Sequence, residues 1–144
     1  MEPTTFSGDP LGLLPRTGEH VRVSGLTNAS TAYILARILR QQGGRFLVYL
    51  PTPVEAEDFV RDLEFFWPEG AGQGDILLYP GYEIKPFFGE SPSIDLVFAR
   101  LNALYALQSG KRPLVVAASA PGALQRSLPR EALSQSLEFI QSGE

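Results

Sequence analysis

The chain has no cysteine, a single histidine and no long apolar run, and each absence excludes a class of function. Without cysteine there is no disulfide, no thiol nucleophile and no zinc–thiolate site. No apolar stretch approaches the roughly 20 residues that cross a bilayer. Residues 1–6 lack the basic and apolar regions of a secretory signal peptide. We therefore expect a cytoplasmic protein that does not bind a membrane.

Basic and nucleophilic patterns are also scarce. The 12 Lys and Arg against 16 Asp and Glu give a net charge of −4, whereas nucleic-acid modules carry a basic excess. His20, the one histidine, has no partner pattern for a triad or a metal cluster, and the nucleophile motif Gly-x-Ser-x-Gly is absent. We therefore predict no catalytic residue and no metal site, and no cofactor for these residues.

The remaining composition is that of one globular domain. The chain has 144 residues, of which 44% are hydrophobic and 19% charged, enough to enclose a core. Residues 1–18 carry several Pro and Gly around Leu11, Leu13 and Leu14, and we expect an extended arm there. We expect residues 19–140 to form one domain and 141–144 to be a tail at the boundary of a fragment.

Strands and helices alternate through residues 19–140, which predicts a three-layer α/β/α fold with a mostly parallel sheet and right-handed crossovers. The expected strands are 20–24, 45–50, 75–79 and 113–118. The expected helices are 29–42, one that starts at Thr52-Pro53 with Glu55 closing a capping box, one from Ser91-Pro92 to Gly110, and one near 121–128 capped by Ser119. Residues 133–140 are ambiguous, with an edge strand weakly favoured.

Two helices show a clear apolar pattern. The helix after Thr52 is expected to bury Ala56, Phe59, Val60, Leu63 and Phe66. Its acidic residues in 55–64 could pair for acid–base chemistry, but helical spacing favours a solvated face. In the helix before Gly110 the apolar residues repeat at i, i+3, i+4 and i+7 and predict a core face: Ile94, Val97, Phe98, Leu101, Leu104 and Tyr105.

The loop 25–32 has the position of a phosphate-binding loop without its chemistry. A working loop has Gly, four residues, then Gly-Lys-Ser/Thr between a strand and a helix. Here Gly25 is followed by Ser30, Thr31 and Ala32 in place of the second glycine, the lysine and the metal-binding hydroxyl. We interpret it as a tight turn with Thr27 or Asn28 capping the helix. The alternative is weak anion binding at the helix N-terminus.

The segment around residues 79–88 is the most aromatic candidate for an interaction surface. Tyr79 and Tyr82 come first, and the predicted surface comprises Tyr82, Glu83, Lys85, Phe87 and Phe88. Aromatic residues beside a cation stack on single-stranded bases or anchor a protein interface. One lysine is a weak electrostatic signal, so we favour packing within the domain, then protein contact, then nucleic acid.

Three phrases of the sequence resemble the N-terminal region of the bacterial transcription-repair coupling factor family, Mfd. They lie at 79–87, 91–105 and 114–126. They match the family phrases "P-D-W-E-x-L-P-Y", "S-P-x-x-D-I-V-x-x-R-L-x-x-L-Y" and "I-V-V-x-x-x-x-A-L-x-Q-R". The matching residues are Pro80, Glu83, Pro86, Ser91, Pro92, Asp95, Val97, Arg100, Leu101, Leu104, Tyr105, Leu124, Gln125 and Arg126. Gly81, Tyr82 and Phe87 depart from the commonest Asp, Trp and Tyr.

The resemblance implies a P-loop NTPase-like fold of the type seen in the first domain of UvrB, with a degenerate phosphate loop at Gly25, Ser30, Thr31 and Ala32. It implies a non-catalytic domain of an ATP-driven DNA translocase that releases stalled RNA polymerase and recruits UvrA for nucleotide excision repair. ATP and Mg²⁺ would be bound by the motor domains of that parent protein, and DNA would be contacted only through the parent. UvrB inserts a damage-probing hairpin after the strand that matches 75–79, and residues 82–92 are too few for it.

Two other functions remain open from the residues alone. The first is a nucleotide enzyme in which Lys85 or Lys111, the two lysines, approaches the loop 25–32. The second is a weak nucleotide- or DNA-binding α/β domain of a UvrB/helicase-type repair protein. The resemblance favours the scaffold domain over both.

Overall fold

The computed structural model of the chain describes residues 20, 22–67, 76–82, 91–110 and 113–133. The predicted arm 1–18 and tail 141–144 lie outside these residues. The described elements, in chain order, are α1 (Asn28–Gln42), β1 (Arg45–Leu50), α2 (Pro53–Phe66), β2 (Ile76–Tyr79), α3 (Ile94–Ser109), β3 (Leu114–Ser119) and α4 (Ala120–Ala123).

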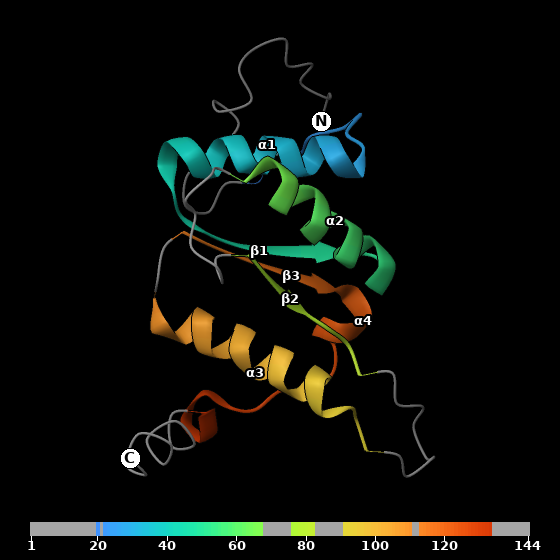
Figure 1. Cartoon of the computed structure of the whole chain (residues 1–144), viewed down its shortest axis with the longest axis vertical. Helices are drawn as coiled ribbons and strands as arrows, with labels where there is room; N and C mark the ends of the chain where they lie inside the picture. The colour runs from blue at the N-terminus through green and yellow to red at the C-terminus, as the bar shows by residue number, and fades with distance from the viewer. Residues whose placement is uncertain (1–19, 21, 68–75, 83–90, 111–112, 134–144) are drawn as a thin grey trace.

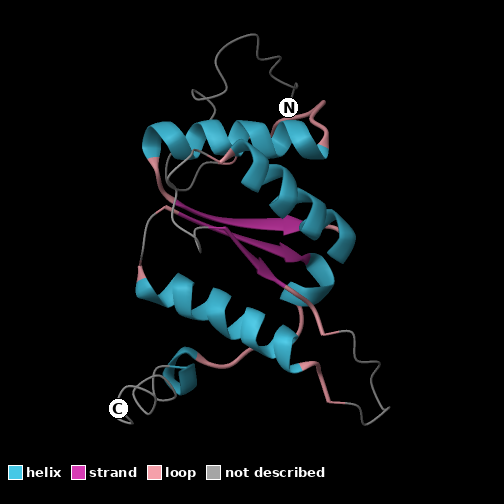
Figure 2. Cartoon of the chain, viewed as in Figure 1, coloured by secondary structure: helices cyan, strands magenta, loops and turns pink. Residues whose placement is uncertain are grey.

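The strands form a small, open, all-parallel sheet in the order β1-β3-β2. Figures 1 and 2 show α1 and α2 over one face of this sheet and α3 over the other. Every residue of β3 is buried, as expected for a central parallel strand covered on both faces. The predicted α/β layering is thus present around three strands.

Each face of the sheet has its own core. On one side Leu35 and Leu39 of α1 and Phe59 and Leu63 of α2 pack against Val115. On the other side Ala103 of α3 belongs to a second cluster with four sheet residues: Tyr79, Leu114, Val116 and Ala118. Alternate residues of β3 therefore serve opposite cores, which fixes the register of the strand.

Local signals set the helix ends. Thr52 Oγ1 accepts a hydrogen bond from the Glu55 N–H at 3.2 Å, and Glu55 Oε2 accepts one from the Thr52 N–H at 3.1 Å, which is the predicted capping box. Pro53 occupies the first turn of α2. The C-terminus of α1 is also set locally. Gly43 has φ +62° and its N–H donates to the Leu39 carbonyl, so the helix ends at a residue with a left-handed φ, which favours glycine.

Four predictions about elements are corrected. His20 and residues 22–24 are not in a strand, because no described strand supplies the backbone partners that a strand there would need. The helix predicted from Ser91 begins at Ile94, and the one predicted at 121–128 covers only Ala120–Ala123. Of the segment 133–140, for which an edge strand was weakly favoured, only Leu133 is described, and it lies in a helical stretch at 130–133; the remainder lies outside the described residues.

The apolar pattern of α3 also misled the prediction of its core face. Ile94, Phe98 and Tyr105 are 68%, 62% and 42% exposed, whereas Arg100 and Ala103 are buried. α3 is apolar on most sides, so periodicity alone does not select its inner face. In α2, Ala56, Phe59 and Leu63 are buried as predicted, whereas Val60 and Phe66 are half-buried.

Candidate functional site

The turn before α1 is closed by its own hydroxyl groups. Ser30 Oγ accepts a hydrogen bond from the Thr27 N–H at 2.7 Å and lies 2.9 Å from the Thr27 carbonyl oxygen, to which it donates. Thr31 Oγ1 also donates to that carbonyl, at 2.9 Å. Ala32 is fully buried against the core. Thr27 is the N-cap, as one of the two predicted candidates.

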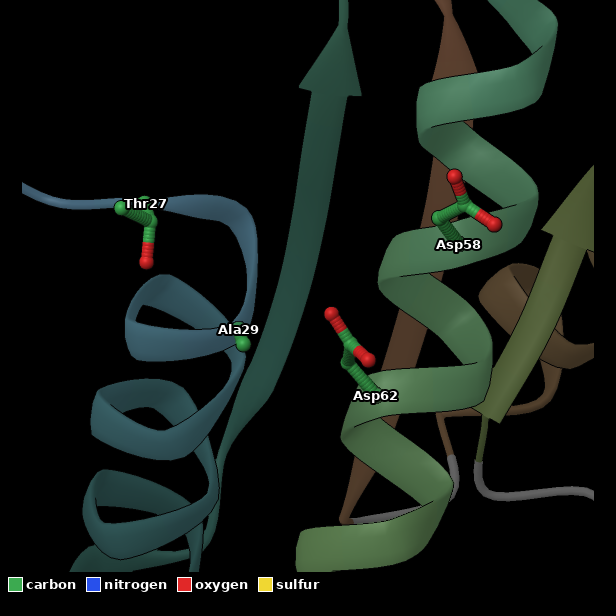
Figure 3. Close-up of a pocket in the computed structure, with 4 residues that line it drawn as sticks. All are labelled: Thr27, Ala29, Asp58 and Asp62. Atoms are coloured by element: carbon green, nitrogen blue, oxygen red, sulfur yellow. The ribbon is translucent and has the colours of Figure 1, made fainter.

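Two carboxylates stand opposite this turn. Thr27 and Ala29 line an open cleft together with Asp58 and Asp62 of α2, and Figure 3 shows the Asp62 carboxylate extending from α2 toward the first turn of α1. Arg61 pairs with Asp58 at 2.9 Å, but its side chain is 74% exposed, so this pair is weak. The predicted solvated acidic face is therefore half-buried at Asp58 and Asp62.

This arrangement disfavours a phosphate. A phosphate loop uses free backbone N–H groups and a lysine to hold negative charge. Here the hydroxyls at positions 30 and 31 are engaged with Thr27, and the cleft is lined by carboxylates. The two candidate cations, Lys85 and Lys111, lie outside the described residues.

A second site centres on Arg100, whose side chain lies between α3 and the carboxyl ends of β2 and β3. Arg100 is 2% exposed. Its Nη1 donates to the Pro80 carbonyl at 2.7 Å and to the Gly122 carbonyl at 3.3 Å, and its Nη2 donates to the Arg126 carbonyl at 3.3 Å. Within the described ranges no carboxylate lies at ion-pair distance from it. Among the described residues, backbone carbonyl dipoles therefore supply compensation for this buried charge.

Two aromatic rings add to that compensation. The guanidinium carbon lies 4.1 Å from the centroid of Tyr79 and 4.4 Å from that of Tyr82, within the range of cation–π attraction. Gln125 then fixes the chain at Tyr82, because its Oε1 accepts from the Tyr82 N–H at 2.6 Å and its Nε2 donates to the Tyr82 carbonyl at 2.9 Å. The exit of β2 is thus tied to the segment after α4.

Glycine allows this close approach. A Cβ at Gly122 would lie 2.9 Å from the Gly81 backbone nitrogen and 3.0 Å from Ser119 Oγ. Ser119, as predicted, caps α4 by accepting from the Gly122 N–H at 3.2 Å. The segment that follows β2 therefore packs directly on the start of α4, backbone against backbone.

A cavity of about 170 Å³ lies beside the Arg100 site, at the carboxyl ends of β2 and β3. Small ligands of open α/β sheets bind at this edge. The wall is mostly apolar, and the residues are Pro53, Ala56, Glu57, Leu78, Tyr79, Pro80, Gly81, Tyr82, Leu96, Ser119, Pro121 and Gln125. The volume is below that of typical ligand pockets, so the cavity does not by itself indicate a cofactor.

The structure describes only one of the five residues of the predicted interaction surface. Tyr82 packs on Arg100 inside the domain, which agrees with the favoured interpretation for the aromatic segment. Glu83, Lys85, Phe87 and Phe88 lie outside the described residues, so the predicted interaction surface stays a prediction. Sequence reasoning missed the burial of Arg100, although a charged residue between Val97 and Leu104 of an apolar helix was a usable signal.

Within the described residues, no three metal-ligating side chains gather, and none of the helices is long and apolar enough to span a membrane. No protein-family model matches the chain, and comparisons with curated proteins and with solved structures gave no match.

Proposed function

We propose that this chain is a non-catalytic N-terminal domain of a transcription-repair coupling factor. In that role it supports the recruitment of UvrA, and with it nucleotide excision repair, to stalled RNA polymerase. The parent protein is an ATP-dependent DNA translocase whose motor domains bind ATP and Mg²⁺. The domain itself is of the UvrB type with a degenerate phosphate loop, and it contacts other domains of the same protein.

The observation that carries this proposal is the convergence of the three family-like phrases on Arg100. Pro80 comes from the first phrase, Arg100 from the second, and Gln125 and Arg126 from the third. Hydrogen bonds of 2.7, 3.4 and 3.3 Å join Arg100 to these residues. Phrases that are separate in sequence thus act as one unit in the fold, which supports the view that their likeness to the family is not three independent coincidences.

The geometry of the α1 turn supports the non-catalytic part of the proposal. The hydroxyl groups of Ser30 and Thr31 donate hydrogen bonds to the Thr27 carbonyl. Ala32 is buried, and Asp58 and Asp62 line the cleft at the turn. These features oppose the binding of a polyphosphate, because none of them supplies positive charge and the two carboxylates, Asp58 and Asp62, supply negative charge.

Calorimetric titration with ATP and Mg²⁺ tests this part directly. We expect no binding heat from this chain, with UvrB, whose phosphate loop is intact, as the positive control. Tight ATP binding that is lost in Thr31→Ala would contradict the proposal and favour a nucleotide enzyme with an unusual loop. The double variant Thr31→Lys with Ala32→Thr, meant to restore nucleotide binding, is less decisive, since Ala32 is fully buried and a larger polar side chain there would also disturb the core.

The scaffold role is tested in the full parent protein. Arg100→Lys there should lower UvrA recruitment while the ATPase rate of the motor domains stays unchanged, because Arg100 lies within this domain alone. An equal loss of ATPase and recruitment would contradict a separate scaffold role.

A gel shift of the 144-residue chain on duplex DNA at physiological salt tests the alternative of a DNA-binding domain, and we expect no shift at a net charge of −4.

A further inference from the structure

We propose that three aromatic rings on α1 and α2 are a docking surface for residues 10–15 of this chain's own N-terminal arm. The rings belong to Tyr33 of α1 and to Phe65 and Phe66 at the end of α2, and together they form the aromatic platform. Tyr33 and Phe65 are 45% and 82% exposed, and Phe66 is half-buried. A cluster of exposed large apolar side chains marks an interaction surface, whereas exposed apolar residues that stand alone are ordinary.

The platform is contiguous and held in one shape. The Tyr33 and Phe66 rings pack edge to face with their centroids 5.4 Å apart, and the Phe65 and Phe66 rings do the same at 5.1 Å. Arg40 Nη2 donates a hydrogen bond to the Phe66 carbonyl at 2.9 Å, which ties α1 to the end of α2. A surface that is already ordered loses little conformational freedom when a partner docks on it.

The arm has the composition that binds such a surface. Residues 10–15 read Pro-Leu-Gly-Leu-Leu-Pro. Extended segments with proline bind aromatic-lined surfaces, because proline restricts their conformation before they bind. The three leucines add apolar area that docking would remove from water.

The arm is also attached on the correct side of the sheet. Residues 22–27 lead into the N-terminus of α1, and Figure 1 shows this entry on the face that α1 and α2 cover. The chain from Leu14 to Asn28 spans up to about 45 Å when extended. Tyr33 lies only about 8 Å along α1 from Asn28. Residues 10–15 can therefore reach the platform of their own chain.

The longer segments elsewhere that lie outside the described residues fit the platform less well. Residues 68–75 follow α2 closely, but they contain no large apolar side chain. Residues 83–90 connect β2 to α3 in the sequence. Residues 134–144 follow the helical stretch 130–133, which Figure 1 shows on the side of the sheet that α3 covers. These comparisons select the arm as the occupant.

A spin label on Gly12→Cys tests the docking in the full chain, which has no cysteine of its own. The label leaves the leucines in place and broadens the NMR signals of nuclei near it. We expect broadening at Tyr33 and Phe65 and none at Phe98, which is 62% exposed on α3 and serves as the matched site. Leu13→Ser with Leu14→Ser should abolish the broadening, whereas Thr4→Ala in the same arm should preserve it.

Substitutions on the platform test the other side of the contact. Phe65→Ser should abolish the broadening at Tyr33, and Phe98→Ser should preserve it. Both side chains are largely exposed, so circular dichroism should show a folded domain in each variant.

A mixture of spin-labelled chain with isotope-labelled chain that carries no spin label distinguishes the arm from a second copy. We expect no broadening in this mixture, because the contact lies within one chain. Four results would each overturn the proposal: no broadening in the spin-labelled chain, equal broadening at Phe98, broadening that survives Phe65→Ser or the leucine variant, or broadening transferred between copies in the mixture.

Discussion

Arg100 is a charged side chain that the fold buries on neutral partners in the described part of the chain. Three backbone carbonyls, the Gln125 side chain and two tyrosine rings surround its guanidinium. A guanidinium suits this place because its planar, forked donors reach several acceptors at once and its faces stack on rings. It joins the end of β2, α3 and the segment after α4.

Arg100→Ala should destabilise the domain by about 3 kcal/mol, because it leaves buried carbonyls unpaired and empties the space between two rings. Arg100→Lys should lower the free energy of unfolding by a smaller amount, since a lysine keeps the positive charge but lacks the forked donors of the guanidinium. Denaturant unfolding followed by circular dichroism measures both. Arg61→Ala is the control, and it should change stability by less than about 0.5 kcal/mol because Arg61 is largely exposed. Equal effects at the two positions would refute the role given to Arg100.

Gly122 is a second residue whose role depends on a tertiary contact. Gly122→Ala should cost about 1–3 kcal/mol, because the new Cβ would lie 2.9 Å from backbone and has no room to move. Gly25→Ala should cost about 1–2 kcal/mol, through its φ of +81° alone, since nothing lies within 4 Å of the added atom. Thermal unfolding of the two variants separates crowding from backbone strain. A neutral Gly122→Ala would show that α4 can move away from Gly81.

At the scale of elements, helix starts are set locally and helix faces are not. The start of α2 follows from Thr52, Pro53 and Glu55, all within four positions. The inner face of α3 follows from its contacts with the sheet, because an apolar helix has no unique inner side in sequence. The capping box was therefore predicted correctly, whereas the exposed positions of Ile94 and Phe98 were not.

The capping box can be measured separately from packing. Thr52→Ala should destabilise α2 by about 1 kcal/mol, because it removes the acceptor for the Glu55 N–H. Glu64→Ala, at an exposed position near the other end of the helix, serves as the control and should stay within about 0.5 kcal/mol of the parent chain. Urea unfolding followed by the circular dichroism signal of the helices measures the stability of both variants. If both variants behave alike, the box contributes nothing beyond helix propensity.

At the scale of the whole molecule, one core joins α1, α2 and the sheet. Leu63 is 0% exposed and belongs to the same cluster as Leu35 and Val115. Leu63→Ala should cost about 3 kcal/mol, because it leaves a cavity between α1, α2 and the sheet. The unfolding midpoint should fall by the same amount whether helix content or tertiary packing is followed. Phe65→Ala, two positions away and 82% exposed, should change stability by less than about 0.5 kcal/mol. Separate transitions for helices and tertiary contacts would argue against a single cooperative unit.

The sequence by itself determined the alternation of helices and strands, the ends of α1 and α2, and the presence of Ser30, Thr31 and Ala32 where a phosphate loop has Gly-Lys-Ser/Thr. These follow from short-range periodicity, caps and residue types. Only the tertiary structure decided the strand order β1-β3-β2, the unpaired state of residues 22–24, the placement of Asp58 and Asp62 opposite the α1 turn, and the burial of Arg100. Each of these depends on contacts between residues far apart in the chain, and neither local propensity nor periodicity specifies such contacts.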